Sequence, residues 1–159
     1  IRSDDIDSWR GFYCDDKISH QKEERCRDHL LALLRQGPEG VVYDPEKHIA
    51  ADKEVDIWCS TVSASIPIEI KGQWHKDVWD AADLQLDRLY TADHQAQRLG
   101  IYLVLWFGKN AKLKGPGRGG DAPSSPEQMA RMLEARSQAA TQGRVKIIVL
   151  NLARDTEEV

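Results

Sequence analysis

Two short segments in the middle of the chain alternate polar and apolar residues with a period of two. In residues 54–59 the acidic side chains and Trp58 fall on one face, and the aliphatic side chains fall on the other. In residues 68–71 the two isoleucines take one face, whereas Glu69 and Lys71 take the opposite one. This alternation is typical of strands, and the polar segment Ser60–Ser65 between them predicts a turn. We therefore expect a hairpin with one apolar face and one charged face.

Helices and further strands are predicted around this hairpin. Periodic apolar positions predict helices over residues 17–36 and 76–98, and a third from Pro126, capped by Ser125, to about residue 142. Strands are expected at 40–43, at an edge near 48–50 after a turn at 44–47, at 101–107 and at 145–152. The order of these helices and strands along the chain predicts an α/β fold, a three-layer-like sandwich in which helices flank a central mixed β-sheet.

The length of 159 residues suits a single domain with a sizeable core. Because the chain begins with Ile1, we expect a domain excised from a longer protein, with residues 1–16 as a lead or linker and 154–159 as a tail. No apolar run approaches the ~20 residues of a membrane helix, so no membrane partner is expected. Three cysteines without a CxxC pair favour a reducing compartment, which predicts a cytoplasmic location, and fit no zinc-finger spacing.

The charged face of the hairpin predicts a cation site. Neighbouring strands lie about 5 Å apart, so Asp56 opposite Glu69 or Lys71 would gather two carboxylates and an ammonium group. Two close carboxylates repel each other unless a cation lies between them. Mg²⁺ binds one or two protein carboxylates, keeps several waters and accepts phosphate oxygens. A bound ion acidifies water, and the lysine could orient that water or offset charge that develops on a phosphate.

These residues, in this order, resemble the PD-(D/E)xK nuclease superfamily. Asp56 is followed by Glu69-Ile70-Lys71, then by a Q-x4-Y helix motif from Gln85 to Tyr90 and the apolar strand at 101–107. Val55 stands where the name of the superfamily has proline. The resemblance implies a restriction-endonuclease-like core that binds Mg²⁺ or Mn²⁺ through Asp56, Glu69 and the Ile70 carbonyl. It also implies that Lys71 positions or activates water and that Gln85 is an outer member of the site.

A glutamate on the first predicted helix is a further candidate. Glu23 falls about 20° from Leu30, the centre of the apolar face, whereas Glu24 falls about 120° away. In the superfamily that the chain resembles, a helical glutamate often completes the metal site. Glu23 is therefore a candidate catalytic residue with Glu24 in reserve, and the alternative is a solvated helix start.

Substrate contacts are expected just beyond the last strand of the hairpin and in a later loop. Gly72 would let a phosphate approach the backbone closely. Residues 108–123 are glycine-rich and basic, which predicts a flexible phosphate-binding loop, or simply an exposed loop kept soluble by its lysines. For the residues just beyond the strand, the alternative is that Trp74 packs its loop onto the core. The candidate substrate-binding residues are Trp74, His75, Lys76, Tyr90, Lys109, Lys112 and Lys114.

The leading interpretation is a metal-dependent nuclease, a DNA endonuclease effector domain of a bacterial defence or restriction-type system. Its expected partners are double-stranded DNA, a second copy of the chain for cutting both strands, and a fused sensor or ATPase domain. A net charge of −4 argues against a general nucleic-acid-coating protein, so affinity must come from local basic patches. The alternatives are an inactive nuclease-fold module for nucleic-acid binding or protein interaction, and an interaction domain whose charges are simply solvated.

Overall fold

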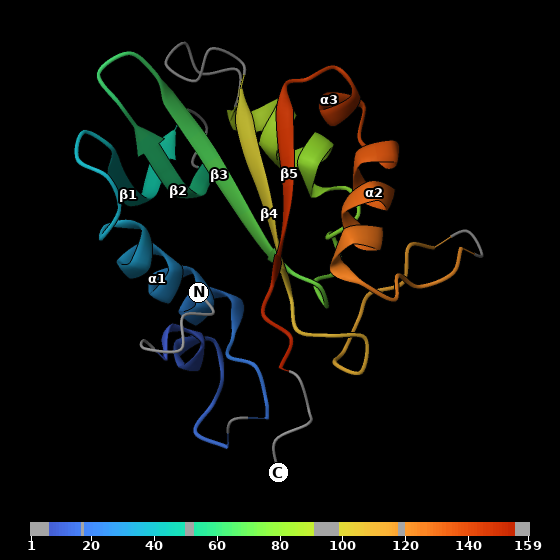
Figure 1. The fold of residues 1–159 in the computed structure, drawn as a ribbon. Coiled ribbons are helices and arrows are strands. Elements are labelled where there is room, and N and C mark those ends of the chain that lie inside the picture. The colour runs from blue at the N-terminus through green and yellow to red at the C-terminus, as the bar shows by residue number, and fades with distance from the viewer. Residues whose placement is uncertain (1–6, 17, 50–52, 91–98, 118–119, 155–159) are drawn as a thin grey trace.

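The computed structural model describes residues 7–16, 18–49, 53–90, 99–117 and 120–154. Five strands form one mixed sheet in the order β1-β2-β3-β4-β5 (Figure 1). The first three strands pair antiparallel, and the last two run parallel to β3. The expected α/β fold with a mixed sheet is thus confirmed. The strands are β1 (Val42–Ile49), β2 (Lys53–Ser60), β3 (Ser65–Gly72), β4 (Gly100–Trp106) and β5 (Val145–Asn151).

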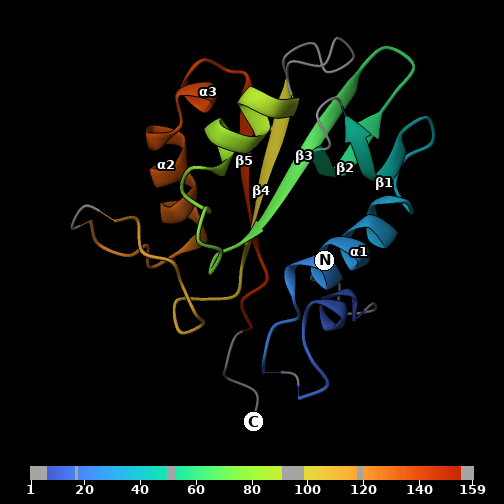
Figure 2. The ribbon, with the colours of Figure 1, turned by 180° about the vertical axis from the view of Figure 1, so that it is seen from behind.

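Helices cover both faces of the sheet, as Figures 1 and 2 show. One face packs against η2 (Ala82–Tyr90), α2 (Pro126–Arg136) and α3 (Gln138–Thr141). The other packs against η1 (Ser8–Phe12) and α1 (Glu23–Leu34). The first core contains Trp58, Leu86, Tyr102, Trp106, Met129 and Leu133, and the second contains Phe12, Leu30, Ile57, Ile70 and Leu105.

The predicted hairpin is present as β2 and β3, and the backbone of Thr61 and Ala64 closes its turn. Its charged face is not open as we expected. Trp58 is only 1% exposed, and β3 is buried on both faces from Pro67 to Gly72. The reason is that helices lie against both sides of the sheet. Glu69 and Lys71 consequently belong to the interior of the protein.

The first helix is shorter than the sequence predicts. It begins at Glu23 rather than at residue 17 and ends at Leu34. The Asp16 carboxylate accepts hydrogen bonds from the backbone of Ile18 and Ser19, and Tyr13 pairs with His20. These bonds hold the preceding residues in a turn that competes with helix formation. The N-terminal lead therefore joins the second core, and Phe12 is fully buried.

Two other predicted helices are divided differently. Residues 76–80 form turns before η2, a π-helix over Ala82–Tyr90, and residues 91–98 lie outside the described part of the chain. The predicted helix over 126–142 breaks at Ser137, whose hydroxyl caps α3 by accepting from the Ala140 backbone. β1 runs straight through Pro45, where a turn was expected, because proline is tolerated on an edge strand.

None of the helices in the described ranges has the length and apolar character needed to cross a membrane.

Candidate functional site

The candidate site lies where β2 and β3 separate. The ladder between the two strands ends at Ile57 opposite Ile68. At Asp56, the residue before Ile57, the side-chain carboxylate accepts a hydrogen bond of 2.8 Å from the Ile70 backbone N–H. A side chain thus bonds a backbone N–H of β3 beyond the end of the ladder. This bond fixes the Asp56 carboxylate beside the strand that carries Glu69 and Lys71.

Lys71 connects the acidic residues. Its ammonium group donates to Glu69 Oε1 at 2.5 Å and to the Ile70 carbonyl at 3.1 Å, and it lies 3.6 Å from Glu23 Oε1. The side chains of Glu69 and Lys71 are only 4% and 9% exposed. Because these charges are shielded from water, their interactions are stronger than those of a surface ion pair.

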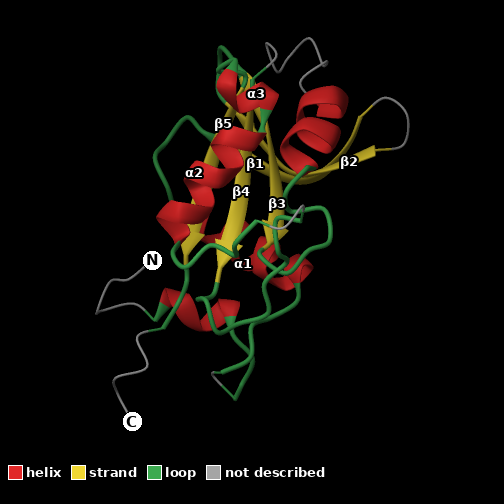
Figure 3. Ribbon diagram, turned by 90° about the vertical axis from the view of Figure 1, so that its right-hand side faces the viewer, coloured by secondary structure: helices red, strands yellow, loops and turns green. Residues whose placement is uncertain are grey.

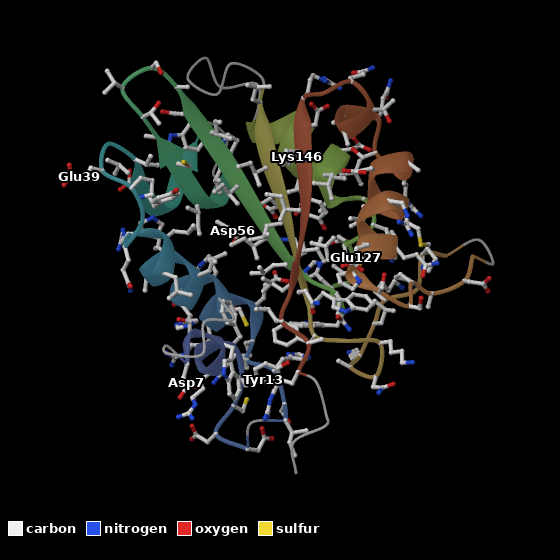
Figure 4. All side chains as sticks on the ribbon, viewed as in Figure 1. Asp7, Tyr13, Glu39, Asp56, Glu127 and Lys146 are labelled. Atoms are coloured by element: carbon white, nitrogen blue, oxygen red, sulfur yellow. The ribbon has the colours of Figure 1, made fainter. Side chains whose placement is uncertain are left out.

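Glu23 reaches this cluster from the first turn of α1. Its Oε2 accepts a hydrogen bond of 2.7 Å from the Gly72 backbone N–H, so α1 is tied to the carboxyl end of β3. Figure 3 shows α1 beside the ends of β3 and β4, and Figure 4 shows Asp56 between α1 and the sheet. The structure therefore brings together Asp56, Glu69, Lys71 and Glu23, which we call the acid cluster. Glu24 is exposed.

The electrostatics of the acid cluster follow from this crowding. Burial, together with the nearby charge of Asp56, raises the pKa of Glu69 to about 7. Burial also raises the pKa of Asp56, and the charge of Lys71 opposes that rise. For Lys71, burial alone would lower the pKa, but the combined charges of Glu69, Asp56 and Glu23 raise it above its ordinary value. Lys71 is therefore an ammonium ion at neutral pH.

Arg27 is a member of the site that the sequence interpretation missed. Its guanidinium lies 3.8 Å from Asp56 Oδ1, and its side chain is 14% exposed. It follows Glu23 by one helical turn, so both side chains lie on the same face of α1. This i,i+4 spacing is the signal that could have identified it.

The residues offer oxygen ligands of the kind that Mg²⁺ or Mn²⁺ prefers, but not a closed cage. Within the described residues, no three His, Cys, Asp or Glu side chains are grouped closely enough to hold a metal ion together. Asp56, Glu69 and the Ile70 carbonyl supply two carboxylates and one neutral oxygen, and Mg²⁺ needs no more from the protein. The Lys71 ammonium is already bonded to Glu69 and Ile70, so these oxygens bind a cation in this structure. The donor set fits, provided that the ammonium moves aside.

Gln85 lies on η2, which covers the face of the sheet that carries Glu69 and Lys71. Leu86, next to Gln85, packs in the same core as Tyr102, the residue aligned with Glu69 on the neighbouring strand. The Gln85 side-chain oxygen is buried, and no residue that the structure describes donates a hydrogen bond to it. Among the described residues, no hydrogen bond joins Gln85 to the acid cluster. The side chain of Tyr90 lies outside the described part of the structure, so the Q-x4-Y motif is seen only at its first position.

The residues just beyond β3 are used for packing. Trp74 stacks on His20 with ring centroids 3.6 Å apart, and its ring also covers Gly72, where an added Cβ would lie 2.5 Å away. The close approach of a phosphate to Gly72 is therefore blocked, because Trp74 fills the space and Glu23 takes the N–H. His75 Nδ1 accepts from the Asp77 backbone, and Lys76 is exposed.

The three lysines of the later loop are also exposed, namely Lys109, Lys112 and Lys114. They follow the carboxyl end of β4, which lies beside that of β3 (Figure 1). A separate surface hollow, lined in part by Thr141, Gly143 and Lys146, shares no residue with the acid cluster or with this loop.

Comparison with known proteins assigns the chain to a family. The family model described as "Domain of unknown function (DUF8371)" matches residues 3–109, which is more than half of the chain and includes every member of the acid cluster. Searches of curated proteins and of solved structures gave no match. The chain therefore belongs to the DUF8371 family.

Proposed function

We propose that this protein is a metal-dependent nuclease that hydrolyses phosphodiester bonds in nucleic acid, and that it acts on DNA as an endonuclease with Mg²⁺ or Mn²⁺. The observation that carries the proposal is the position of the Lys71 ammonium. The ammonium is bonded to Glu69 and lies 3.6 Å from Glu23. Lys71 belongs to β3, and the N–H of its neighbour Ile70 donates to Asp56 on β2. Packing alone gives no reason to gather a buried Glu69 and two partly exposed carboxylates around one lysine, because such clusters cost desolvation energy. Metal-dependent phosphodiester hydrolysis needs carboxylates that hold the metal ion and, beside them, a positive charge that stabilises the phosphate.

Each residue has a role that follows from its contacts. Asp56 and Glu69, with the Ile70 carbonyl, would hold the metal ion, which when bound supplies acidified water and offsets charge on phosphate oxygens. Lys71 stays protonated because its pKa is raised, so it serves as a positive charge that stabilises the phosphate in the transition state rather than as a base. Glu23 keeps that ammonium near the strand end. Gln85 has a buried oxygen to which none of the described residues donates, and this supports an outer role as an acceptor for water.

Plasmid cleavage tests the proposal. Supercoiled DNA is incubated with wild type, Lys71→Ala and Lys146→Ala in Mg²⁺, in Mn²⁺ and in EDTA. We expect nicking or linearisation with either metal, none in EDTA, at least a hundredfold slower cleavage by Lys71→Ala, and no change for Lys146→Ala. Cleavage that persists in Lys71→Ala would show that another site is responsible.

A second candidate is a nucleic-acid-binding module of the same fold without hydrolytic activity. The observation in its favour is that an ammonium already neutralises the carboxylates and that the described residues contain no group of three metal-binding side chains. Calorimetric titration with Mn²⁺ separates the two. Binding that is lost in Asp56→Asn and Glu69→Gln supports the nuclease, whereas no binding together with no cleavage supports the inactive module.

The wider assignments depend on the nuclease activity. Action in a bacterial defence or restriction-type system, a cytoplasmic location, a second copy for double-strand cutting and a fused sensor or ATPase domain remain parts of the proposal. Strand preference and oligomeric state are read from the same cleavage experiment, because a monomer with one site yields nicked circles before linear DNA.

A further inference from the structure

Gln73 is a fully buried polar residue that lies two positions beyond Lys71 and was not anticipated as functional. Its side-chain amide donates to the backbone carbonyls of Gly108, Ala111 and Lys112, at 3.0, 3.4 and 3.1 Å. Its side-chain oxygen accepts from the Phe107 N–H at 2.7 Å. One side chain thus organises the first part of the chain that follows β4.

The same chain segment has further attachments. The Gln73 carbonyl accepts from the Lys114 N–H at 2.9 Å, and the Lys114 carbonyl accepts from the Trp79 indole at 2.7 Å. The Pro116 carbonyl accepts from Arg136 at 2.8 Å. Residues 108–116, which we call the lysine loop, are therefore held along their length by bonds to their backbone carbonyls and amides.

The bonds leave the lysine side chains of the loop free to point into solvent. Lys109, Lys112 and Lys114 are exposed, and within the described part of the chain none of their ammonium groups forms an ion pair. Three cations within six residues repel one another, so the buried backbone bonds must offset this repulsion. The net charge of the protein is −4, so the three lysines form a cationic segment in an otherwise acidic chain.

We propose that Gln73 is a positioning residue that holds the lysine loop as a fixed cationic ridge for the phosphate backbone of DNA, beside the strand that ends in the acid cluster. This inference rests on the proposed nuclease function for its choice of partner. The Cα atoms of Gln73 and Lys71 are at most ~7 Å apart, because only one residue separates them in the chain. The ridge and the acid cluster are therefore both attached to the end of β3. A preorganised ridge binds a polyanion without first ordering its own backbone, which lowers the entropic cost of binding.

The chemistry of Gln73 is specific to this arrangement. An amide can donate and accept at once, and here its two N–H groups are shared among three carbonyls while its oxygen accepts from one N–H. Methionine has a similar length but neither donor nor acceptor of comparable strength. Gln73→Met therefore leaves the lysines in place and releases the loop from its main attachment.

The salt dependence of DNA binding tests the proposal. A fluorescein-labelled 25-base-pair duplex of mixed sequence is titrated in EDTA, where no cleavage occurs, and the affinity is followed by anisotropy over a series of KCl concentrations. Each phosphate contact adds about 0.9 to the slope of log affinity against log salt. The triple variant K109A/K112A/K114A should lower that slope by about 2.7, and Gln73→Met should lower it by a similar amount although it removes no charge.

The controls separate this inference from the proposed function. Lys146 is an exposed lysine near the amino end of β5, whereas the lysine loop follows the carboxyl end of the parallel strand β4, so Lys146→Ala should leave the slope unchanged (Figure 4). Wild-type protein that binds the duplex with this slope but cleaves nothing with metal would refute the nuclease and leave the ridge in place. Metal-dependent cleavage with an unchanged slope in the triple variant would refute the ridge alone.

Folding is checked by far-ultraviolet circular dichroism before each titration. If Gln73→Met does not fold, Trp79→Phe replaces it, because the Trp79 indole donates to the Lys114 carbonyl of the same loop and its removal changes no charge. A slope equal to that of wild type in the folded anchor variant, or no duplex binding by wild type, would overturn the proposal.

Discussion

At the scale of single residues, the protonation of Glu69 is the property of the acid cluster that can be measured most directly. Its pKa is raised from 4.5 to about 7, first by burial and then by Asp56. Between these two pH values the folded state keeps a proton that the unfolded state has released, so the free energy of unfolding falls as the pH rises. The shift corresponds to about 3 kcal/mol, lost between pH 4.5 and pH 8. Asp56 contributes with the same sign.

The Glu69→Gln variant lacks this titration. Urea denaturation at pH 5 and pH 8, followed by tryptophan fluorescence, should show that wild type loses about 2.5 kcal/mol more than the variant over this interval. Equal losses in the two proteins would mean that Glu69 is ionised in the folded state at pH 5.

The second residue-scale prediction concerns Lys71. Lys71→Met leaves Glu69 and Glu23 without their cation, and a broken buried ion pair costs about 3–5 kcal/mol. We expect that loss at pH 8 and a smaller one at pH 5, where Glu69 is protonated in the folded state. The free energy of unfolding in urea measures both.

Lys76→Met is the matched control, because the Lys76 side chain is 83% exposed and should change stability by less than about 0.5 kcal/mol. A Lys71→Met variant as stable as this control at pH 8 would contradict the geometry of the cluster.

At the scale of elements, the junction between β3 and the following turn depends on a glycine. A Cβ at Gly72 would lie 2.5 Å from the Trp74 ring, and that ring is held by its stack on His20. We expect Gly72→Ala to cost about 1–3 kcal/mol, as overpacking does, and to shift the fluorescence of the displaced tryptophan. Thermal unfolding measures the cost.

The loop glycine Gly115 provides the comparison for that substitution, because no atom of the described residues lies within 4 Å of a Cβ built there. Gly115→Ala should be close to neutral. If both alanine variants have the same melting temperature, Trp74 is free to move away from Gly72.

The elements themselves were predictable where the periodicity of the sequence matches the packing. The hairpin of β2 and β3, the buried strand β4 and the serine cap of α2 were all found from local pattern. The first helix was predicted six residues too long at its start, because a side chain, Asp16, competes for the backbone there. The π-helical bonding of η2 was not predictable either, since its i→i+5 pattern has no distinct sequence signature.

The acid cluster shows a similar division between what the sequence reveals and what it hides. Asp56, Glu69, Lys71 and Glu23 were anticipated, because alternation on a strand and the periodicity of a helix each assign a face. Gln73 was missed since a glutamine after a strand looks like any loop residue, and its partners are 34 to 39 positions away. Long-range bonds of this kind depend on how the elements pack.

At the scale of the whole molecule, the family model and the folded unit do not end at the same place. The match stops at residue 109, which includes the acid cluster and the first four strands. The core on the η2 face is nevertheless completed by later residues, including Met129, Leu133 and Val145, all at most 4% exposed. Those residues come from α2 and β5, so the matched segment lacks the fifth strand and one of the helices that cover the η2 face of the sheet.

A fragment of residues 1–109 should therefore not fold by itself. Without β5, the apolar strand β4 becomes an open edge, and the buried faces of Tyr102 and Trp106 are exposed to water. Far-ultraviolet circular dichroism with urea should show no cooperative transition for the fragment, whereas the 159-residue chain gives one. A cooperative transition in the fragment, with a midpoint near that of the full chain, would show that residues 110–159 are an addition to the fold rather than half of one of its cores.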